Sequence, residues 1–144
     1  MTEEKIKKEH IATGIQVANW EKAIQASGDL LIKSGAVTTE YVKQMIRSVK
    51  EHGPYIVIGP GIALAHARPS EAVREDAISL VVLKEGVSFG NEDNDPVDLV
   101  FSFSATGSDS HLKMMEDLSR ILIDEQKVEQ LRQAKTAKEV YQSL

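Results

Sequence analysis

The chain has 144 residues, 42% of them apolar and none of them cysteine, and its 17 Lys and Arg against 22 Asp and Glu give a net charge of −5. This length fits one domain, because a chain of about 150 residues buries about 70% of its unfolded surface in a single core. Without cysteine, disulfides, iron–sulfur clusters, Cys-containing zinc sites and thiol nucleophiles are excluded. The acidic balance argues against nucleic-acid binding, which depends on Lys and Arg.

The first residues predict a charged lead-in rather than a helix or strand. Lysine and glutamate are mixed through residues 3–9, which is typical of a solvated segment. No apolar stretch there resembles a signal peptide, and none elsewhere is long enough to span a membrane. We therefore expect a cytoplasmic protein with a single domain over residues 1–144, a lead-in over 1–14, and an exposed His10 within that lead-in.

Two amphipathic helices are predicted next. Apolar residues recur with helical spacing after a cap at Asn19 and stop before Gly35. The same spacing returns from Thr38 or Thr39 and ends at Gly53, which proline follows. Each helix has one apolar face, so both should pack on a common core.

The middle of the chain predicts strands. The run 77–83 is almost continuously apolar, as in strands covered on both faces, and apolar residues alternate along 97–104. Residues 90–96, between these two runs, form an acidic loop that we interpret as a solvated turn. The strands that can be located from the sequence are 55–58, 62–64, 77–83 and 97–104.

Helical spacing returns after the strands. One helix starts with a cap at Ser108 or Asp109, and two shorter ones close the chain, the last with a capping box from Thr136 to Glu139. Helices before and after a group of strands predict an α/β fold, with three α-β-α layers and a central mixed sheet of about five strands flanked by helices.

Several common motifs are absent. The triplet 59–61 lacks the Lys of a Walker A loop and the third Gly of a dinucleotide fingerprint. The acidic loop has Ser104 where an EF-hand needs Glu, and residues 107–110 lack the second Gly of a nucleophile elbow. No His-Glu-x-x-His pattern is present, so neither a metal nor another cofactor is indicated.

The histidines carry the remaining information. His52 lies at a helix C-terminus, where capping explains it. His66 ends a predicted strand, and ligands of open α/β sheets bind at strand ends, although a structural histidine bonded to a backbone carbonyl is the alternative. His111 lies in the first turn of a helix, where free N–H groups attract anions, although a half-buried residue at the edge of the core is the alternative.

The stretch 53–69, which contains Gly61-Ile-Ala-Leu-Ala-His66, together with His111 opening a Leu/Met-rich helix, resembles the IIA components of the bacterial sugar phosphotransferase system. The resemblance covers about residues 15–144 and lies in the mannitol/fructose superfamily, nearest to its ascorbate-specific branch. It implies a phosphotransferase that takes a phosphoryl group from the carrier HPr onto His66, at the tele nitrogen Nε2. The group would pass to a cysteine of a separate IIB component and reach the sugar, L-ascorbate, at the IIC membrane permease.

The resemblance also implies roles for other residues. The residue matching His111 lies beside the active histidine and stabilises the phosphoryl group. The mannitol-type pattern has an arginine upstream, but Ser48 stands near its place and Arg47 one residue earlier, so Arg47 and Arg68 are both candidate anion partners. Ala65 replaces the usual proline before the histidine. An apolar rim of Ile62, Leu64 and Met114 would suit docking. The resemblance also implies a homodimer.

Two other functions stay open on the sequence alone. One is a IIA-like regulatory module that senses phosphorylation by binding a partner and transfers nothing onward. The other is an α/β binding domain in which both histidines are structural. A phosphohistidine that passes its group on would exclude both.

Overall fold

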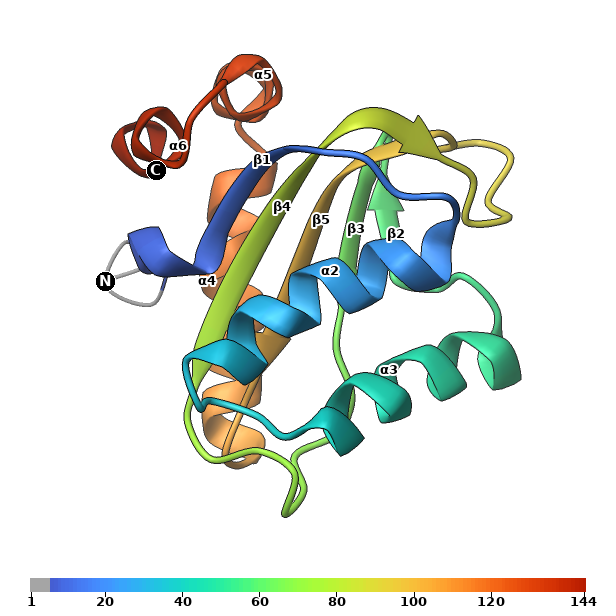
Figure 1. The fold of residues 1–144 in the computed structure, drawn as a ribbon, viewed down its shortest axis with the longest axis vertical. Coiled ribbons are helices and arrows are strands. Elements are labelled where there is room, and N and C mark those ends of the chain that lie inside the picture. Colours follow the sequence, from blue (N-terminus) through green and yellow to red (C-terminus); the bar gives the residue numbers. More distant parts are fainter. Residues whose placement is uncertain (1–5) are drawn as a thin grey trace.

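The computed structural model describes residues 6–144 (Figure 1). In chain order its elements are the 3-10 helix η1 (Lys8–His10), β1 (Ile11–Ile15), α2 (Trp20–Lys33), α3 (Thr39–His52), β2 (Val57–Gly59), β3 (Ile62–Ala65), β4 (Ala77–Val87), β5 (Val97–Ser104), α4 (Ser108–Leu122), α5 (Glu125–Gln133) and α6 (Ala137–Ser143). The strands form one sheet in the order β1-β4-β5-β3-β2. The sheet is mixed, because β1 runs parallel to β4 and β3 parallel to β5, while the other neighbours are antiparallel.

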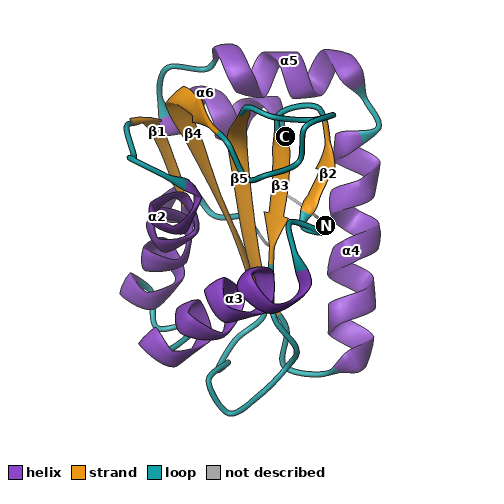
Figure 2. Ribbon diagram, turned by 90° about the vertical axis from the view of Figure 1, so that its right-hand side faces the viewer, coloured by secondary structure: helices purple, strands orange, loops and turns teal. Residues whose placement is uncertain are grey.

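Helices cover both faces of the sheet, as Figure 2 shows with α2 and α3 on one side and α4 on the other. Because successive side chains of a strand point to opposite faces of the sheet, the core has two parts, one on each face. Val81 of β4 packs in a cluster with Met45 of α3, and its neighbour Leu80 packs in a second cluster with Leu118 of α4. The predicted three-layer α-β-α fold is confirmed. Within residues 6–144 no helix combines the length and apolar character needed to cross a membrane.

The expectation of a lead-in that includes an exposed His10 is wrong for the part of it that the structure describes. Residues 11–15 form β1, in which Ile11 pairs with Leu80 of β4. His10 is only 2% exposed, and its Nε2 lies 2.8 Å from the Ser34 hydroxyl, so burial lowers its pKa. The strand was missed because Thr13 and Gly14 interrupt its apolar pattern. Residues 1–5 of the predicted lead-in lie outside the described residues.

The helix boundaries largely follow the predicted caps. Asn19 Oδ1 accepts the Lys22 N–H at 2.9 Å at the start of α2, and the Thr136 hydroxyl accepts the Glu139 N–H at 3.1 Å at the start of α6. Helix α4 differs, because its N-cap is Gly107 rather than Ser108 or Asp109.

Residues 90–96 form the predicted solvated loop between β4 and β5, and Asp95 holds it together. Its carboxylate accepts the backbone N–H groups of Phe89, Gly90 and Asn91 at 2.9–3.0 Å and the hydroxyl of Ser88 at 2.8 Å. Desolvation alone would raise the pKa of Asp95, but these hydrogen bonds together outweigh it and hold the pKa below its usual value.

Replacing Asp95 with Ala should therefore lower the free energy of unfolding at pH 7 by about 1 kcal/mol, a value that allows for the partial solvent exposure of the carboxylate. Because the folded pKa is depressed, this stabilisation is present above the unfolded value of 3.8 and is lost as the pH falls through the folded value. Urea unfolding at pH 7 and at acid pH tests this, with Asp93→Ala in the same loop as the control. Equal losses for both variants at pH 7 would contradict the role of Asp95.

Candidate functional site

The site lies at the edge of the sheet where β3 and β5 both end. These strands are parallel, and their register pairs Leu64 with Phe101 and Ala65 with Ser102. The next residues, His66 and Phe103, are therefore neighbours on the same face of the sheet. Helix α4 starts four residues after β5 ends and covers this face, which brings His111 of its first turn to the same edge.

Four aromatic rings meet in this site: those of His66, Phe103, His111 and Tyr55. The His66 ring stacks on Phe103, with ring centroids 5.0 Å apart and an angle of 16° between planes. His111 lies edge-on to both, 5.6 Å from His66 and 5.1 Å from Phe103. Tyr55, just before β2, meets His66 at 5.8 Å and 87°. The predicted proximity of His66 and His111 is thus present in the structure.

One hydrogen bond sets the tautomer of His66. Nδ1 lies 2.9 Å from the carbonyl oxygen of Leu64. Because a carbonyl oxygen only accepts, Nδ1 must carry the proton, and a neutral ring then has its lone pair on Nε2. Burial lowers the pKa of His66, and His111 lowers it further, whereas the bond to Leu64 acts in the opposite direction. The ring is therefore neutral at pH 7, with a nucleophilic Nε2.

This shift has a measurable consequence for the reactivity of His66. Since its pKa lies below 6.5, more than half of the His66 rings should still be neutral and nucleophilic at pH 6.5. The rate of any reaction at Nε2, measured by quenched-flow at saturating donor, should therefore stay above half of its pH 8 value at pH 6.5. A rate that already halves at pH 6.5 would contradict the lowered pKa.

His111 lies at the fourth position of α4, next to the free N–H groups of the first turn. Its backbone N–H bonds to Gly107 O at 3.0 Å, whereas its buried Nδ1 has no hydrogen-bond partner among residues 6–144. The free N–H groups of this first turn lie beside the His66 ring and suit an anionic ligand.

The two candidate arginines lie in a hollow beside the site. Arg47 and Arg68 line one hollow of about 300 Å³, together with Ser48 and with Ala67, the residue after His66. Both are exposed, and Arg47 makes a 3.9 Å ion pair with Glu40. Neither has a hydrogen bond to His66 in the part of the chain that the structure describes. Both arginines therefore lie near the site, and their positions do not distinguish which of them is the anion partner.

The model of the family described as phosphoenolpyruvate-dependent sugar phosphotransferase system, EIIA 2, matches residues 4–144. The chain belongs to this family. EIIA components are phosphotransferases, so the chain is a phosphocarrier of a sugar uptake system. This confirms the resemblance drawn from residues 53–69.

Three proteins show how similar this chain is to known IIA components. The ascorbate-specific EIIA component of Salmonella choleraesuis is 36% identical over 122 residues, 84% of this chain and 79% of its own. A putative IIA from Streptococcus mutans has 34% identity and a TM-score of 0.86, over 99% of this chain and 89% of its own. The mannitol enzyme IIA of Escherichia coli, solved in complex with phosphorylated enzyme IIB, has 29% identity and a TM-score of 0.83, over 96% of each chain.

Sequence reasoning missed two residues of this EIIA site, Tyr55 and Phe103. The alternation along β5 places Phe103 on one face, but only the pairing of β3 with β5 puts that face beside His66. The Tyr55 hydroxyl bonds to that of Ser48 at 2.8 Å, which links it to the place of the mannitol-type arginine. No local motif marks either contact.

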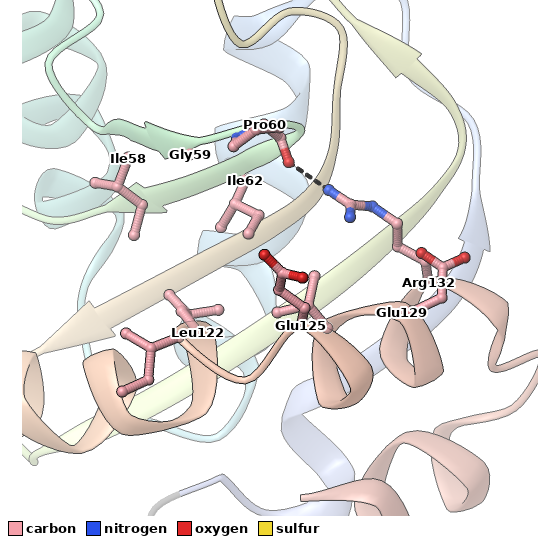
Figure 3. A pocket seen from close by; sticks show the side chains of 10 residues that line it. Ile58, Gly59, Pro60, Ile62, Leu122, Glu125, Glu129 and Arg132 are labelled. Carbon is pink, nitrogen blue, oxygen red and sulfur yellow. Dashed lines mark hydrogen bonds between the residues drawn. The ribbon is translucent and has the colours of Figure 1, made fainter.

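A second hollow, of about 520 Å³, lies at the other end of β2 and β3, beside the turn into α5 (Figure 3). Its lining is largely apolar, with Ile58 and Ile123 exposed at its rim. Arg132 reaches it but is already bonded to the Pro60 carbonyl and to Asp98. No histidine lines it, so the phosphoryl chemistry of an EIIA protein has no acceptor there.

Proposed function

We propose that this EIIA protein accepts a phosphoryl group from phospho-HPr on Nε2 of His66. It passes the group to a cysteine of a separate IIB component. This relay serves the uptake of ascorbate through a IIC permease. The observation that carries the proposal is the Nδ1–Leu64 hydrogen bond, because it leaves Nε2 as the nucleophile. The names of the ascorbate-specific relatives support the sugar, and the mannitol IIA–IIB complex supports IIB as a partner. We place the carrier in the cytoplasm, where these partners would meet it.

Each transfer exchanges one bond to phosphorus for another. The Nε2 lone pair of His66 forms the new N–P bond while the donor's N–P bond breaks, and the donor nitrogen leaves with the electron pair. In the second transfer a cysteine thiolate attacks phosphorus, and Nε2 recovers its lone pair. Throughout, the proton on Nδ1 stays in its hydrogen bond with Leu64. The ring therefore needs no change of tautomer between the two steps.

Charge stabilisation is the other requirement, because the oxygens of the transferred group carry negative charge. We assign His111 and the first turn of α4 to this role, because they lie beside the His66 ring. From the neighbouring hollow, the planar guanidinium group of Arg68 or Arg47 would donate further hydrogen bonds to these oxygens. No ATP, metal or other cofactor is required for this relay.

The partners must dock and leave in turn, so their interfaces should be modest in area and transient. The expected apolar rim of Ile62, Leu64 and Met114 is wrong, because all three are buried in the core between the sheet and α4 and none is more than 6% exposed. Tyr55 is 46% exposed, and its ring lies 5.8 Å from that of His66. Leu112 is 61% exposed and directly follows His111 in the sequence. We propose that these two side chains form the apolar contact with HPr and IIB.

The test is incubation with phosphoenolpyruvate, enzyme I and HPr, followed by intact-mass measurement and addition of IIB. We expect one acid-labile phosphoryl group that disappears from this chain when IIB is added. A chain that gains no phosphoryl group would contradict the proposal. A chain that gains the group and keeps it in the presence of cognate IIB would instead be the regulatory module.

A further inference from the structure

The hydroxyl of Tyr41 ties together the two strand ends that form the site. Tyr41 is the third residue of α3 and is fully buried. Its hydroxyl donates to the Phe103 carbonyl at 2.7 Å and accepts the backbone N–H of Ala67 at 3.0 Å. The Ala67 carbonyl lies farther away, at 3.2 Å. A side chain from the opposite face of the sheet thus contacts the residue after His66 and the residue beneath its ring.

The chemistry of this contact requires an un-ionised phenol. A phenol has a single proton, which the shorter bond to Phe103 uses, and its oxygen lone pair then accepts from Ala67. Burial raises the pKa of Tyr41 to about 12, although the hydrogen bond with Ala67 opposes this. The hydroxyl therefore remains both donor and acceptor at any pH at which the carrier works.

We propose that Tyr41 is a positioning residue for phosphoryl transfer, whose hydroxyl holds His66 over Phe103 so that Nε2 faces the incoming phosphorus. This inference rests on the proposed function and adds a residue to it. Two hydrogen bonds hold His66 in place. Its ring is bonded to the carbonyl of Leu64, two residues earlier. The backbone N–H of the next residue, Ala67, donates to the Tyr41 hydroxyl, its only acceptor among the described residues.

Without the hydroxyl, the Ala67 N–H and the Phe103 carbonyl both lose this partner. The segment that begins at Ala67 also carries Arg68, so its movement would displace a candidate phosphoryl ligand together with the nucleophile. Displacements of about 1 Å from a productive geometry can slow a reaction by about 100-fold. Tyr41 is buried, so it makes no contact with the donor itself, and the proposed docking side chains, Tyr55 and Leu112, keep their sequence and place.

The test is Tyr41→Phe, which keeps the ring and deletes only the hydroxyl. For phosphoryl transfer from phospho-HPr we expect kcat to fall by about tenfold or more with KM within about twofold of wild type. Tyr141→Phe is the matched control, since this tyrosine lies on α6 and is 38% exposed, and we expect it to leave both constants unchanged. A second variant, Ala67→Pro, deletes the N–H donor while Tyr41 stays, and we expect the same loss of kcat.

A role in stability alone would not change the tautomer of His66, which nitrogen-15 NMR of labelled histidine reports. We expect the wild-type ring to be protonated at Nδ1 and the Tyr41→Phe ring to show both tautomers. A folded Tyr41→Phe protein with wild-type kcat and tautomer would overturn the inference while the proposed function stands. If Tyr41→Phe does not fold, wild-type kcat in Ala67→Pro would overturn it. A wild-type chain that takes up no phosphoryl group would overturn both.

Discussion

His66→Ala is expected to take up no phosphoryl group from phospho-HPr, even in incubations long enough to saturate the wild-type chain. The reason is that no other described nucleophile combines its features: a neutral, partly exposed ring with a fixed Nδ1 proton and the lone pair on Nε2. The change also removes a ring that stacks on Phe103, so far-UV circular dichroism must first show that the variant is folded. Intact-mass spectrometry then measures the phosphorylated fraction.

His52→Ala is the matched control for this prediction. His52 lies at the C-terminus of α3, its side chain is 67% exposed, and its only described ion pair is with the adjacent Glu51. We expect it to be phosphorylated at the wild-type rate and extent. A phosphoryl group on folded His66→Ala would mean that another residue is the acceptor.

His111→Ala is expected to slow transfer to and from His66 by about 100-fold while His66 still becomes phosphorylated at long times. Loss of one donor aimed at developing negative charge commonly costs 100-fold to 1000-fold in rate. His111 is placed for this, since it lies in the first turn of α4 and its ring is 5.6 Å from that of His66. Single-turnover transfer from phospho-HPr and to IIB measures the effect.

Two further variants make the test of His111 specific. Glu116→Ala, an exposed position later on the same helix, should transfer at the wild-type rate. His111→Asn, which keeps a side-chain donor, should recover part of the rate lost in His111→Ala. If His111→Ala transfers to IIB as fast as wild type, His111 only supports the fold.

Much of the fold could be predicted from local patterns. The caps at Asn19 and Thr136 and the apolar runs of the central strands all have short-range causes that the sequence displays. Strand β1 could not be predicted this way, because its pairing with β4 joins residues about seventy positions apart. The burial of His10 depends on the same distant contact.

The site shows the same division between local and distant causes. His66 and His111 stand at a strand end and in a first helical turn, which are recognisable positions. Tyr41 and Phe103 reach the site only through the arrangement of α3, β3 and β5, which no local spacing specifies. The expected rim failed for a related reason: Leu64 shares the His66 face of β3, and α4 covers that face up to the end of the strand.

The most direct test of the account is nitrogen-15 and phosphorus-31 NMR of the phosphorylated protein with labelled histidine. The account predicts one phosphoryl group, bonded to Nε2 of His66, with Nδ1 still protonated and bonded to the Leu64 carbonyl. A phosphoryl group on Nδ1 of His66, or on either nitrogen of His111, would contradict it.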